Sequence, residues 1–408
     1  MTVPELLAPA GGAVQLEAAV RYGADAVYLG APRYGMRAFA DNFSLDDMPE
    51  AVAYAHGHGV KLYATLNIFA YDDDFDGLLA SARALHDAGV DAAIVADAGV
   101  VTLLREAFPA WPLHLSTQAN TTNARAAAFW HAQGVSRVIL SRELSLERIV
   151  SLRAGAPQVA LEAFVHGSMC ASVSGRCVLS NHLTGRDANQ GECAQPCRWK
   201  YALVEEKRPG EYMPTGQDDN GFYIYSAKDL CMIGHIDKLC GAGLASLKIE
   251  GRMKTEAYVA TVTAAYRRAI DRWRSHPAAW RPDEGEMREV ARAGHRPFST
   301  GFYFGAPDSP PGTVGTVQTA DFIARVLRWE NGAALCEQRN KVQVGETITA
   351  FSPQKTFDFR VESLYNEEKL PISCAQHPKM LFWIEVERLE PGDLLRRDRN
   401  TDGTGETS

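Results

Sequence analysis

The chain lacks any long hydrophobic run and any excess of positive charge. None of its apolar segments approaches the ~18–20 residues that a membrane-spanning helix needs. Its 42 Lys and Arg residues are outnumbered by 50 Asp and Glu residues, which gives a formal net charge of -8. That balance argues against a non-specific nucleic-acid coat but leaves room for a local basic groove. The first residues, MTVPELLAPAGG, show no basic segment followed by an apolar one. We therefore expect a cytoplasmic protein with no membrane partner.

Several common active-site motifs are also missing. No GxGxxG motif and no GxxxxGKS or GxxxxGKT motif follows a predicted strand, so nothing favours a dinucleotide or a P-loop nucleotide. HExxH and GxSxG, the signatures of many zinc and serine hydrolases, do not occur either. These absences disfavour hydrolases that work through a zinc-bound water or a serine nucleophile.

A repeated pattern predicts the fold. A helix-compatible stretch is followed by Gly and a spacer, then by a short apolar run that ends in polar residues. Gly suits the position after a helix, and short non-alternating apolar runs are typical of parallel strands buried on both faces. Five runs show this pattern, and three more, at 5–11, 113–119 and 159–167, fit the same role without its full form. The eight runs together predict a (β/α)8 barrel of the TIM type, with a doubly wound open sheet as the alternative. The runs lie at 5–11, 21–30, 58–67, 88–97, 113–119, 133–142, 159–167 and 242–251.

The alternation of helix-compatible stretches and short apolar runs is interrupted twice, and these interruptions predict the domain organisation. Residues 1–300 form the barrel domain, with a cysteine-bearing insertion at about 168–230, between the seventh and eighth strands and over the barrel mouth. Within the insertion, 199–207 and 221–226 are expected to pair as a β-hairpin, and an amphipathic helix follows at about 254–274. Short alternating runs predict a small antiparallel, β-barrel-like domain over 310–398. Residues 399–408 are expected to be a disordered tail.

Four cysteines fall within 28 residues of the insertion, at Cys170, Cys177, Cys193 and Cys197. Four thiolates complete either a structural zinc site or an iron–sulfur cluster. CAQPC fits the close spacing of zinc ligands but CASVSGRC does not, and this uneven spacing favours iron–sulfur. The alternative is a set of inert buried thiols. Cys231 is near enough in sequence to serve as a spare ligand, although a core position fits it better.

The segment EAFVHGSMCASVSGRCVLS (162–180) resembles the signature of the collagenase-like peptidase family U32. The resemblance continues through LLAPAGG, GADAVYLG, NQGECAQPCRWKY, SAKDL and SLKIEGRMK, and RNKVQVGETI is similar to the family's C-terminal β module. These motifs cover nearly the whole chain in order. The chain is most similar to a branch that hydroxylates the wobble uridine of tRNA to 5-hydroxyuridine without molecular oxygen.

That resemblance implies an iron–sulfur cofactor, expected to be 4Fe-4S, on Cys170, Cys177, Cys193 and Cys197, with Cys231 as a possible replacement for Cys197. It also implies prephenate as a co-substrate and small-molecule hydroxyl donor, and tRNA, through its anticodon loop, as the partner. Other branches act on ribosomal RNA or on ubiquinone precursors. The peptidase or collagenase activity in the family's name is a further alternative, for which the sequence shows no catalytic dyad.

Polar residues at the ends of the predicted strands are the candidates for substrate binding. Asn67, Gln118 and Asn120 carry amides that can read a base edge, or can instead satisfy loop backbone. Three basic residues near the strand ends can bind a phosphate or a carboxylate, and an arginine among them can do so through two parallel hydrogen bonds. A structural ion pair with Glu143 is the alternative for Arg142. Trp199, in the basic and aromatic segment CRWKY, can stack on a base or pack within the hairpin. The candidate cations are Arg142, Lys248 and Arg252.

The catalytic candidates are His166, Glu162 and Arg252. By strand alternation Glu162, Phe164 and His166 point the same way, which would be into the top of the barrel. His166 is a candidate for proton transfer because the reference pKa of histidine is near 6.5, with a packed histidine as the alternative. Glu250 shares a face with Arg252 and is a candidate to orient it by an ion pair.

Overall fold

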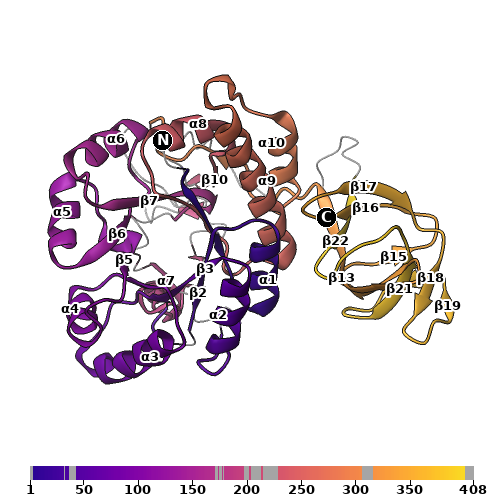
Figure 1. Ribbon diagram of the computed structural model, residues 1–408, viewed down its shortest axis with the longest axis horizontal. Helices are drawn as coiled ribbons and strands as arrows, with labels where there is room; N and C mark the ends of the chain where they lie inside the picture. Colours follow the sequence, from indigo (N-terminus) through magenta and orange to yellow (C-terminus); the bar gives the residue numbers. More distant parts are fainter. Residues whose placement is uncertain are drawn as a thin grey trace.

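The computed structural model shows two domains that lie side by side, a barrel and a smaller β domain (Figure 1). It describes residues 3–31, 33–35, 43–170, 173, 177, 179–196, 202–203, 213–214, 228–305 and 316–399. Among these residues no helix is long and apolar enough to cross a membrane.

Within the described residues, eight parallel strands close into a barrel. They pair in sequence order from β1 to β7, and β11 pairs with both β7 and β1, so the sheet has no open edge between its first and last strands. This confirms the (β/α)8 prediction and rules out the open sheet. The barrel strands are β1 (Glu5–Pro9), β2 (Ala26–Gly30), β3 (Lys61–Leu66), β4 (Ala92–Val95), β5 (Leu113–Leu115), β6 (Val135–Ile139), β7 (Ala160–Ser168) and β11 (Ser246–Ile249).

Helices surround the barrel and reach the strands through short turns. The glycines that the sequence pattern placed after helices all have positive φ, from 73° at Gly59 to 99° at Gly23, where L-residues are strained. The predicted helix at 254–274 is α9 (Glu256–Ser275), which begins at a Thr255 side-chain cap and packs against α1 and α10. The helices of the barrel domain are α1 (Ala13–Arg21), α2 (Met48–Gly57), α3 (Phe75–Asp87), α4 (Ala98–Ala107), α5 (Ala124–Ala132), α6 (Leu146–Gly155), α8 (Ile236–Gly241), α9 and α10 (Glu284–Ala291).

The insertion leaves the barrel at the end of β7 and returns through β10 (Asp229–Cys231), which pairs with β7 in the antiparallel direction. Between them lie α7 (Leu179–Thr184), the short helix η4 (Ala188–Gln190) and the antiparallel pair β8 (Ala202–Leu203) and β9 (Met213–Pro214). The first arm of the predicted hairpin therefore pairs with 213–214, while its expected partner, 221–226, lies outside the described residues.

The C-terminal domain is an antiparallel sheet, as predicted. Its strands run in the order β17-β16-β22-β13-β14-β21-β18-β19 around a separate apolar core that includes Val326, Phe382 and Leu395. The strands are β13 (Ala320–Glu330), β14 (Ala333–Gln338), β15 (Val342–Gln343), β16 (Thr347–Phe351), β17 (Thr356–Arg360), β18 (Leu364–Asn366), β19 (Pro371–Ile372), β20 (Cys374–Ala375), β21 (Leu381–Glu385) and β22 (Leu394–Asp398).

The two domains make specific contacts with each other. The ring of Tyr22 on α1 stacks on Phe351 at 5.1 Å between ring centroids, and its hydroxyl donates to the Phe351 carbonyl at 2.8 Å. Arg21 forms an ion pair with Asp393 at 2.6 Å. Phe351 thus belongs to the barrel's own apolar cluster. Stacked and hydrogen-bonded aromatics fix the orientation of one domain against the other.

Candidate functional site

Polar side chains from several strand ends meet at the mouth of the barrel. Asn67 follows β3, Gln118 lies on the turn after β5, and Arg252 follows β11. Functional residues of such barrels lie at this end because loops after different strands converge there. The sequence pattern placed these residues correctly.

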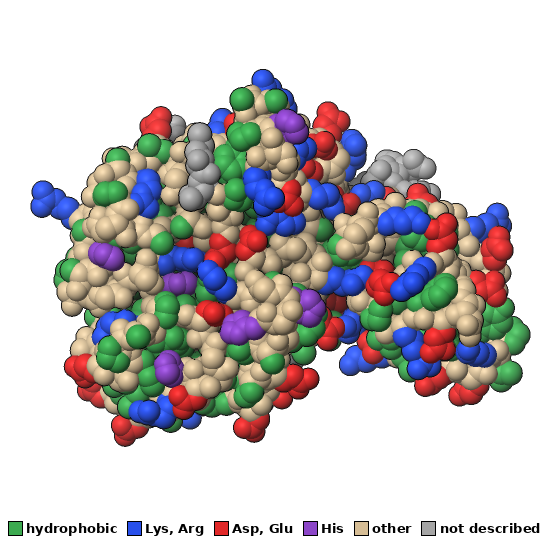
Figure 2. All heavy atoms as spheres, viewed as in Figure 1, with side chains coloured by type: hydrophobic (Ala, Val, Ile, Leu, Met, Phe, Trp, Pro, Cys, Tyr) green, Lys and Arg blue, Asp and Glu red, His purple; other side chains and the backbone are tan. Residues whose placement is uncertain are grey.

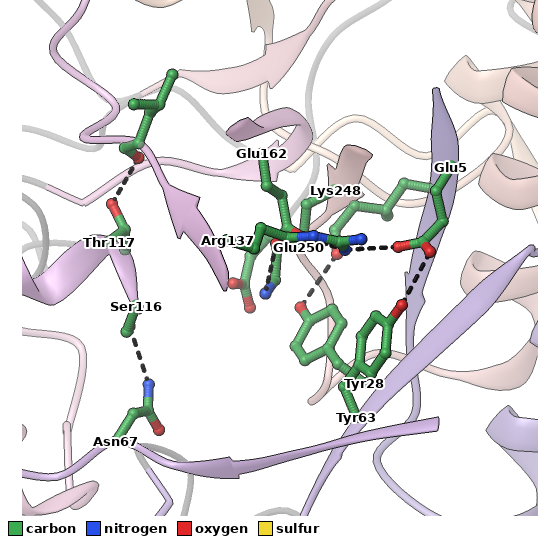
Figure 3. Close-up of polar contacts among 12 residues, drawn as sticks. Glu5, Tyr28, Tyr63, Asn67, Ser116, Thr117, Arg137, Glu162, Lys248 and Glu250 are labelled. Atoms are coloured by element: carbon green, nitrogen blue, oxygen red, sulfur yellow. Dashed lines mark hydrogen bonds and ion pairs between the residues drawn. The ribbon is translucent and has the colours of Figure 1, made fainter. Parts of the chain in front are cut away.

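Two amides of the mouth bind each other. The Asn67 Nδ2 donates to the Ser116 hydroxyl at 3.3 Å (Figure 3). The same Nδ2 donates to Gln118 Oε1 at 2.7 Å, and Ser116 Oγ donates to Gln118 Oε1 at 3.1 Å. All three side chains are buried. Asn120 lies next to them with a left-handed backbone (φ 51°), and its Oδ1 has no hydrogen-bond partner among the described residues. A buried acceptor without a partner has a cost that a bound donor would remove.

The two arginines at the mouth are held in defined positions. Arg252 is 5% exposed, and its Nη1 donates to the Thr65 hydroxyl at 3.0 Å. A side chain at Gly35 would bring a Cβ within 2.9 Å of that same hydroxyl, so this approach requires glycine. Arg142 stacks on the ring of Phe164 at 3.8 Å and donates to the Ser168 carbonyl at 2.8 Å.

The carboxylate next to Arg142 is Glu250, at 3.4 Å. Glu143 instead accepts a hydrogen bond from the Ser141 hydroxyl. From the sequence, an ion pair of Arg142 with Glu143 was one alternative, and an ion pair of Glu250 with Arg252 was a candidate. The structure brings Arg142 and Glu250 together because the ends of β6 and β11 lie on either side of β7.

A charged network fills the barrel below the mouth (Figure 3). Glu162 is fully buried and receives Lys248 Nζ and Arg137 Nη1, each at 3.1 Å. Arg137 also binds Glu5 at 2.7 Å, and Tyr63 donates to the other oxygen of Glu5 at 2.8 Å. Burial alone raises the pKa of Glu162, but the charges of Lys248 and Arg137 outweigh it and hold the pKa below its usual range. The carboxylate is therefore ionised and fully engaged.

This network changes the interpretation of two predicted site residues. Lys248 is 3% exposed, and its ammonium lies 4.2 Å from the centroid of the Tyr28 ring as well as beside Glu162. β7 and β11 are neighbouring strands, and Glu162 and Lys248 both occupy inward-facing positions on them. Both side chains therefore lie in the core of the barrel. Glu162 and Lys248 thus support the barrel from inside and do not line its mouth.

The expectation that Glu162 and His166 point the same way is wrong. The pairing of β7 with β11 runs from Glu162 opposite Ser246 to Phe164 opposite Lys248, then shifts so that His166 lies opposite Ile249. This β-bulge adds one residue and reverses the alternation beyond it. The His166 ring packs on Tyr266 of α9 at 5.5 Å. Burial lowers the pKa of His166 to about 3, so the imidazole is neutral and remote from proton exchange at the mouth.

Three of the four predicted cluster ligands lie in the described part of the insertion. Cys170 is exposed directly after β7, and Cys177 and Cys193 are partly buried. The sulfur atoms of Cys177 and Cys193 each accept a backbone N–H from two residues further along, Leu179 at 3.4 Å and Gln195 at 3.3 Å.

The insertion is docked beside the amide cluster. The Asn189 side chain donates to the Cys177 carbonyl at 3.3 Å, and the Asn189 carbonyl accepts from the backbone N–H of Phe69, also at 3.3 Å. Phe69 is two residues beyond Asn67, so the cysteine-bearing segment adjoins the mouth. The buried Asn189 Oδ1 has no hydrogen-bond partner within the described ranges.

The donor chemistry fits an iron–sulfur cluster, since thiolates are its ligands. Within the residues that the structure describes, no group of three His, Cys, Asp or Glu side chains is arranged to hold a metal ion. Cys170, Cys177 and Cys193 are therefore not gathered into one metal-binding group among these residues, and Cys197 and Trp199 lie outside the described ranges. Cys231 lies in the core, and its burial raises the pKa of the thiol to about 11. The thiolate of Cys231 is therefore disfavoured.

Sequence reasoning missed three partners. Ser116 completes the amide cluster, Glu250 pairs with Arg142, and Arg137 bridges two carboxylates in the core. Arg137 had a signal in the sequence, because a charged residue in the middle of the short apolar strand VSRVI is rarely buried without a partner. The pairing of residues from different strands has no such signal.

The fold and site define a (β/α)8 barrel protein whose mouth adjoins a thiol-bearing insertion and whose barrel is followed by an antiparallel β domain. Residues 11–311 match the family described as Peptidase family U32, and residues 318–396 match Peptidase family U32 C-terminal domain. The chain belongs to peptidase family U32.

Two relatives share nearly the full length of the chain. The chain is 37% identical to tRNA hydroxylation protein P1 of Bacillus subtilis and 35% identical to tRNA hydroxylation protein P of Escherichia coli, each over 97% of this chain and 95% of the relative. A solved structure, that of the U32 peptidase Mk0906, is similar over 62% of this chain and 94% of its own, with 13% identity and a TM-score of 0.41. The chain is thus homologous to tRNA hydroxylation proteins.

Proposed function

We propose that this protein hydroxylates the wobble uridine of tRNA to 5-hydroxyuridine in the cytoplasm. The observation that carries the proposal is the identity of 35–37% to two tRNA hydroxylation proteins over 97% of the chain. The position of the cysteine-bearing insertion beside the barrel mouth supports it, since a base in an unpaired anticodon loop can be turned outward toward such a site.

Cys170, Cys177, Cys193 and Cys197 are the proposed ligands of a 4Fe-4S cluster. Replacing the C5–H of uracil by C5–OH removes two electrons from the base and adds one oxygen atom. Side chains do not carry out such redox chemistry, and a bound cluster would supply the capacity to transfer electrons. Prephenate is the proposed source of the hydroxyl group, and it would also be the oxidant: exchanging its C–OH for C–H takes up the hydrogen and the two electrons that C5 of the base loses.

The residues of the mouth have binding roles in this proposal. Asn67, Gln118 and Asn120 offer amide donors and acceptors to the edge of a uracil. Arg252 and Arg142 offer planar guanidinium groups to a carboxylate or phosphate. None of these residues is assigned a proton-transfer step.

Replacing Arg252 with Lys should reduce modification of tRNA by about tenfold or more, because Lys keeps the charge but loses the planar pair of donors. The measurement is the amount of 5-hydroxyuridine per tRNA in cells that carry the variant as their only copy. Arg274→Lys is the matched control, since Arg274 is exposed on α9. Equal modification by the two variants at equal protein levels would remove Arg252 from the site.

A peptidase is the second candidate, which the family's name suggests. A peptidase needs a nucleophile or a water activated by a neighbouring base or metal. His166, the histidine next to the cysteine motif, is 1% exposed and packs under α9. The buried position of His166 therefore disfavours a peptidase that uses this histidine as its base.

The experiment is nucleoside mass spectrometry of tRNA and ribosomal RNA from a strain without this gene and from its parent. We expect 5-hydroxyuridine and its derivatives to disappear from the tRNA of the deletion strain and to return with the wild-type gene. The hydroxylated nucleosides of ribosomal RNA should be unchanged. In a strain with no second pathway, an unaltered tRNA profile would contradict the proposal.

A further inference from the structure

A polar cleft of about 570 Å³ lies between the barrel and the C-terminal domain, away from the mouth. One wall is formed by α9 and α10, with Arg268 and Arg292, and the other by the hairpin of β16 and β17, with Ser352, Gln354 and Lys355. Figure 2 shows Lys and Arg side chains on both sides of the junction between the domains. A smaller cavity of about 80 Å³ adjoins it and shares Arg292 and Arg396.

The carboxylates of the cleft are already engaged. Glu289 accepts from Arg396 at 3.1 Å and from Arg292 at 3.0 Å. Arg292 also binds Asp398 at 2.7 Å. Asp358 accepts from the Thr349 hydroxyl at 2.6 Å. Glu289 and Asp398 are therefore paired with arginines and Asp358 with a hydroxyl, while Lys355 of the same lining is paired with Glu387.

One arginine of the cleft and one N–H donor remain for a ligand. Arg268 is exposed on α9 and forms no hydrogen bond or ion pair within the described part of the chain. Arg396 is 6% exposed and lines both cavities, and its Nε has no hydrogen-bond partner among the described residues. A buried guanidinium N–H without an acceptor is costly, and an anion in the cleft would satisfy it.

Helix α9 extends from near the barrel mouth to the cleft. The smaller cavity begins at Thr255, which caps α9 three residues after Arg252. Arg268 follows 13 residues later on the same helix, which corresponds to about 20 Å along its axis. A ligand in contact with both the mouth and the cleft would therefore have to span about 20 Å.

We propose that this interdomain cleft binds a backbone phosphate of the RNA substrate, with Arg268 and Arg396 as donors from the barrel side and the C-terminal domain, and Gln354 from the opposite wall. The inference rests on the proposed function, because it takes RNA as the substrate. It gives the C-terminal domain a role in holding RNA outside the anticodon. Phosphate contacts fix position without reading sequence.

The test measures the affinity of the purified full-length protein for an unmodified tRNA transcript at several salt concentrations. Arg268→Glu should weaken binding by about three- to tenfold, and Arg268→Ala should reduce the slope of log K against log salt by about 0.7–0.9. Gln354→Glu, which adds a negative charge to the other wall, should also weaken binding. The matched controls are Arg274→Glu and Arg274→Ala, which make the same changes at an exposed position of α9 outside the cleft lining.

Equal effects at Arg268 and Arg274 would overturn the inference and leave the proposed function intact. A wild-type protein with no affinity for tRNA would contradict the proposed function itself. Inorganic phosphate is titrated separately by calorimetry. Loss of phosphate binding in Arg268→Glu with unchanged tRNA affinity would show a site for a small anion and would also overturn the inference.

Discussion

Replacing Cys193 with Ala should abolish formation of 5-hydroxyuridine and strip the purified protein of iron. The Cys193 sulfur accepts a backbone N–H at 3.3 Å and lies in the insertion that docks beside the amide cluster. Removing one of the four proposed thiolate ligands would leave the proposed cluster with an incomplete ligand set. The measurements are iron and sulfide per chain in protein purified without oxygen, and nucleoside mass spectrometry of tRNA from a strain carrying the variant.

Cys374→Ala is the matched control for this substitution. Cys374 is a partly buried free thiol of β20 in the C-terminal domain, remote in sequence from the insertion. It should keep the wild-type iron content and modification level. Full iron and full modification in Cys193→Ala would show that this cysteine is not a cluster ligand.

Replacing Glu162 with Gln should lower the free energy of unfolding by about 3–5 kcal/mol, because two buried cations lose their shared counter-charge. Gln keeps the volume of the side chain, so the change isolates the charge. Chemical denaturation of the two proteins at neutral pH measures the difference. Glu284→Gln, at an exposed ion pair with Arg288, is the control and should leave stability unchanged. A small effect of Glu162→Gln would mean that the buried network does not support the barrel.

The stability contributed by Glu162 depends on pH with a defined sign. Its pKa in the folded protein lies below the usual value, so the contribution is present above the unfolded-state pKa of about 4.3 and is lost as the pH falls below it. The difference between wild type and Glu162→Gln should therefore be largest near neutral pH and shrink in acid. A difference that stays constant from pH 7 to pH 3 would contradict the ionised carboxylate.

The barrel was predictable because its signals are local. Each barrel strand is a short buried run, and Gly23, Gly59, Gly89, Gly134 and Gly243 mark helix ends by a backbone requirement that other residues meet poorly. The polar residues after the strands, such as Asn67 and Arg252, were placed at the mouth by the same argument, since strand direction fixes which end they occupy.

The details that failed depend on contacts between distant segments. The bulge near Val165 turns His166 out of the barrel, and the sequence of β7 alone does not show where its register with β11 shifts. Likewise, Lys248 was expected at the mouth, but the fully buried Glu162 holds its ammonium inside the core. Charge alone does not tell a binding cation from one that neutralises a buried carboxylate.

Hydroxylation of tRNA by this protein can be tested with the purified protein under oxygen-free conditions, with unmodified tRNA and prephenate. We expect protein loaded with iron and sulfide to form 5-hydroxyuridine at the wobble position, and Cys193→Ala treated in the same way to form none. Equal product from iron-free protein would contradict the role of the cluster. No product from the loaded wild-type protein would contradict the claim that this chain hydroxylates tRNA.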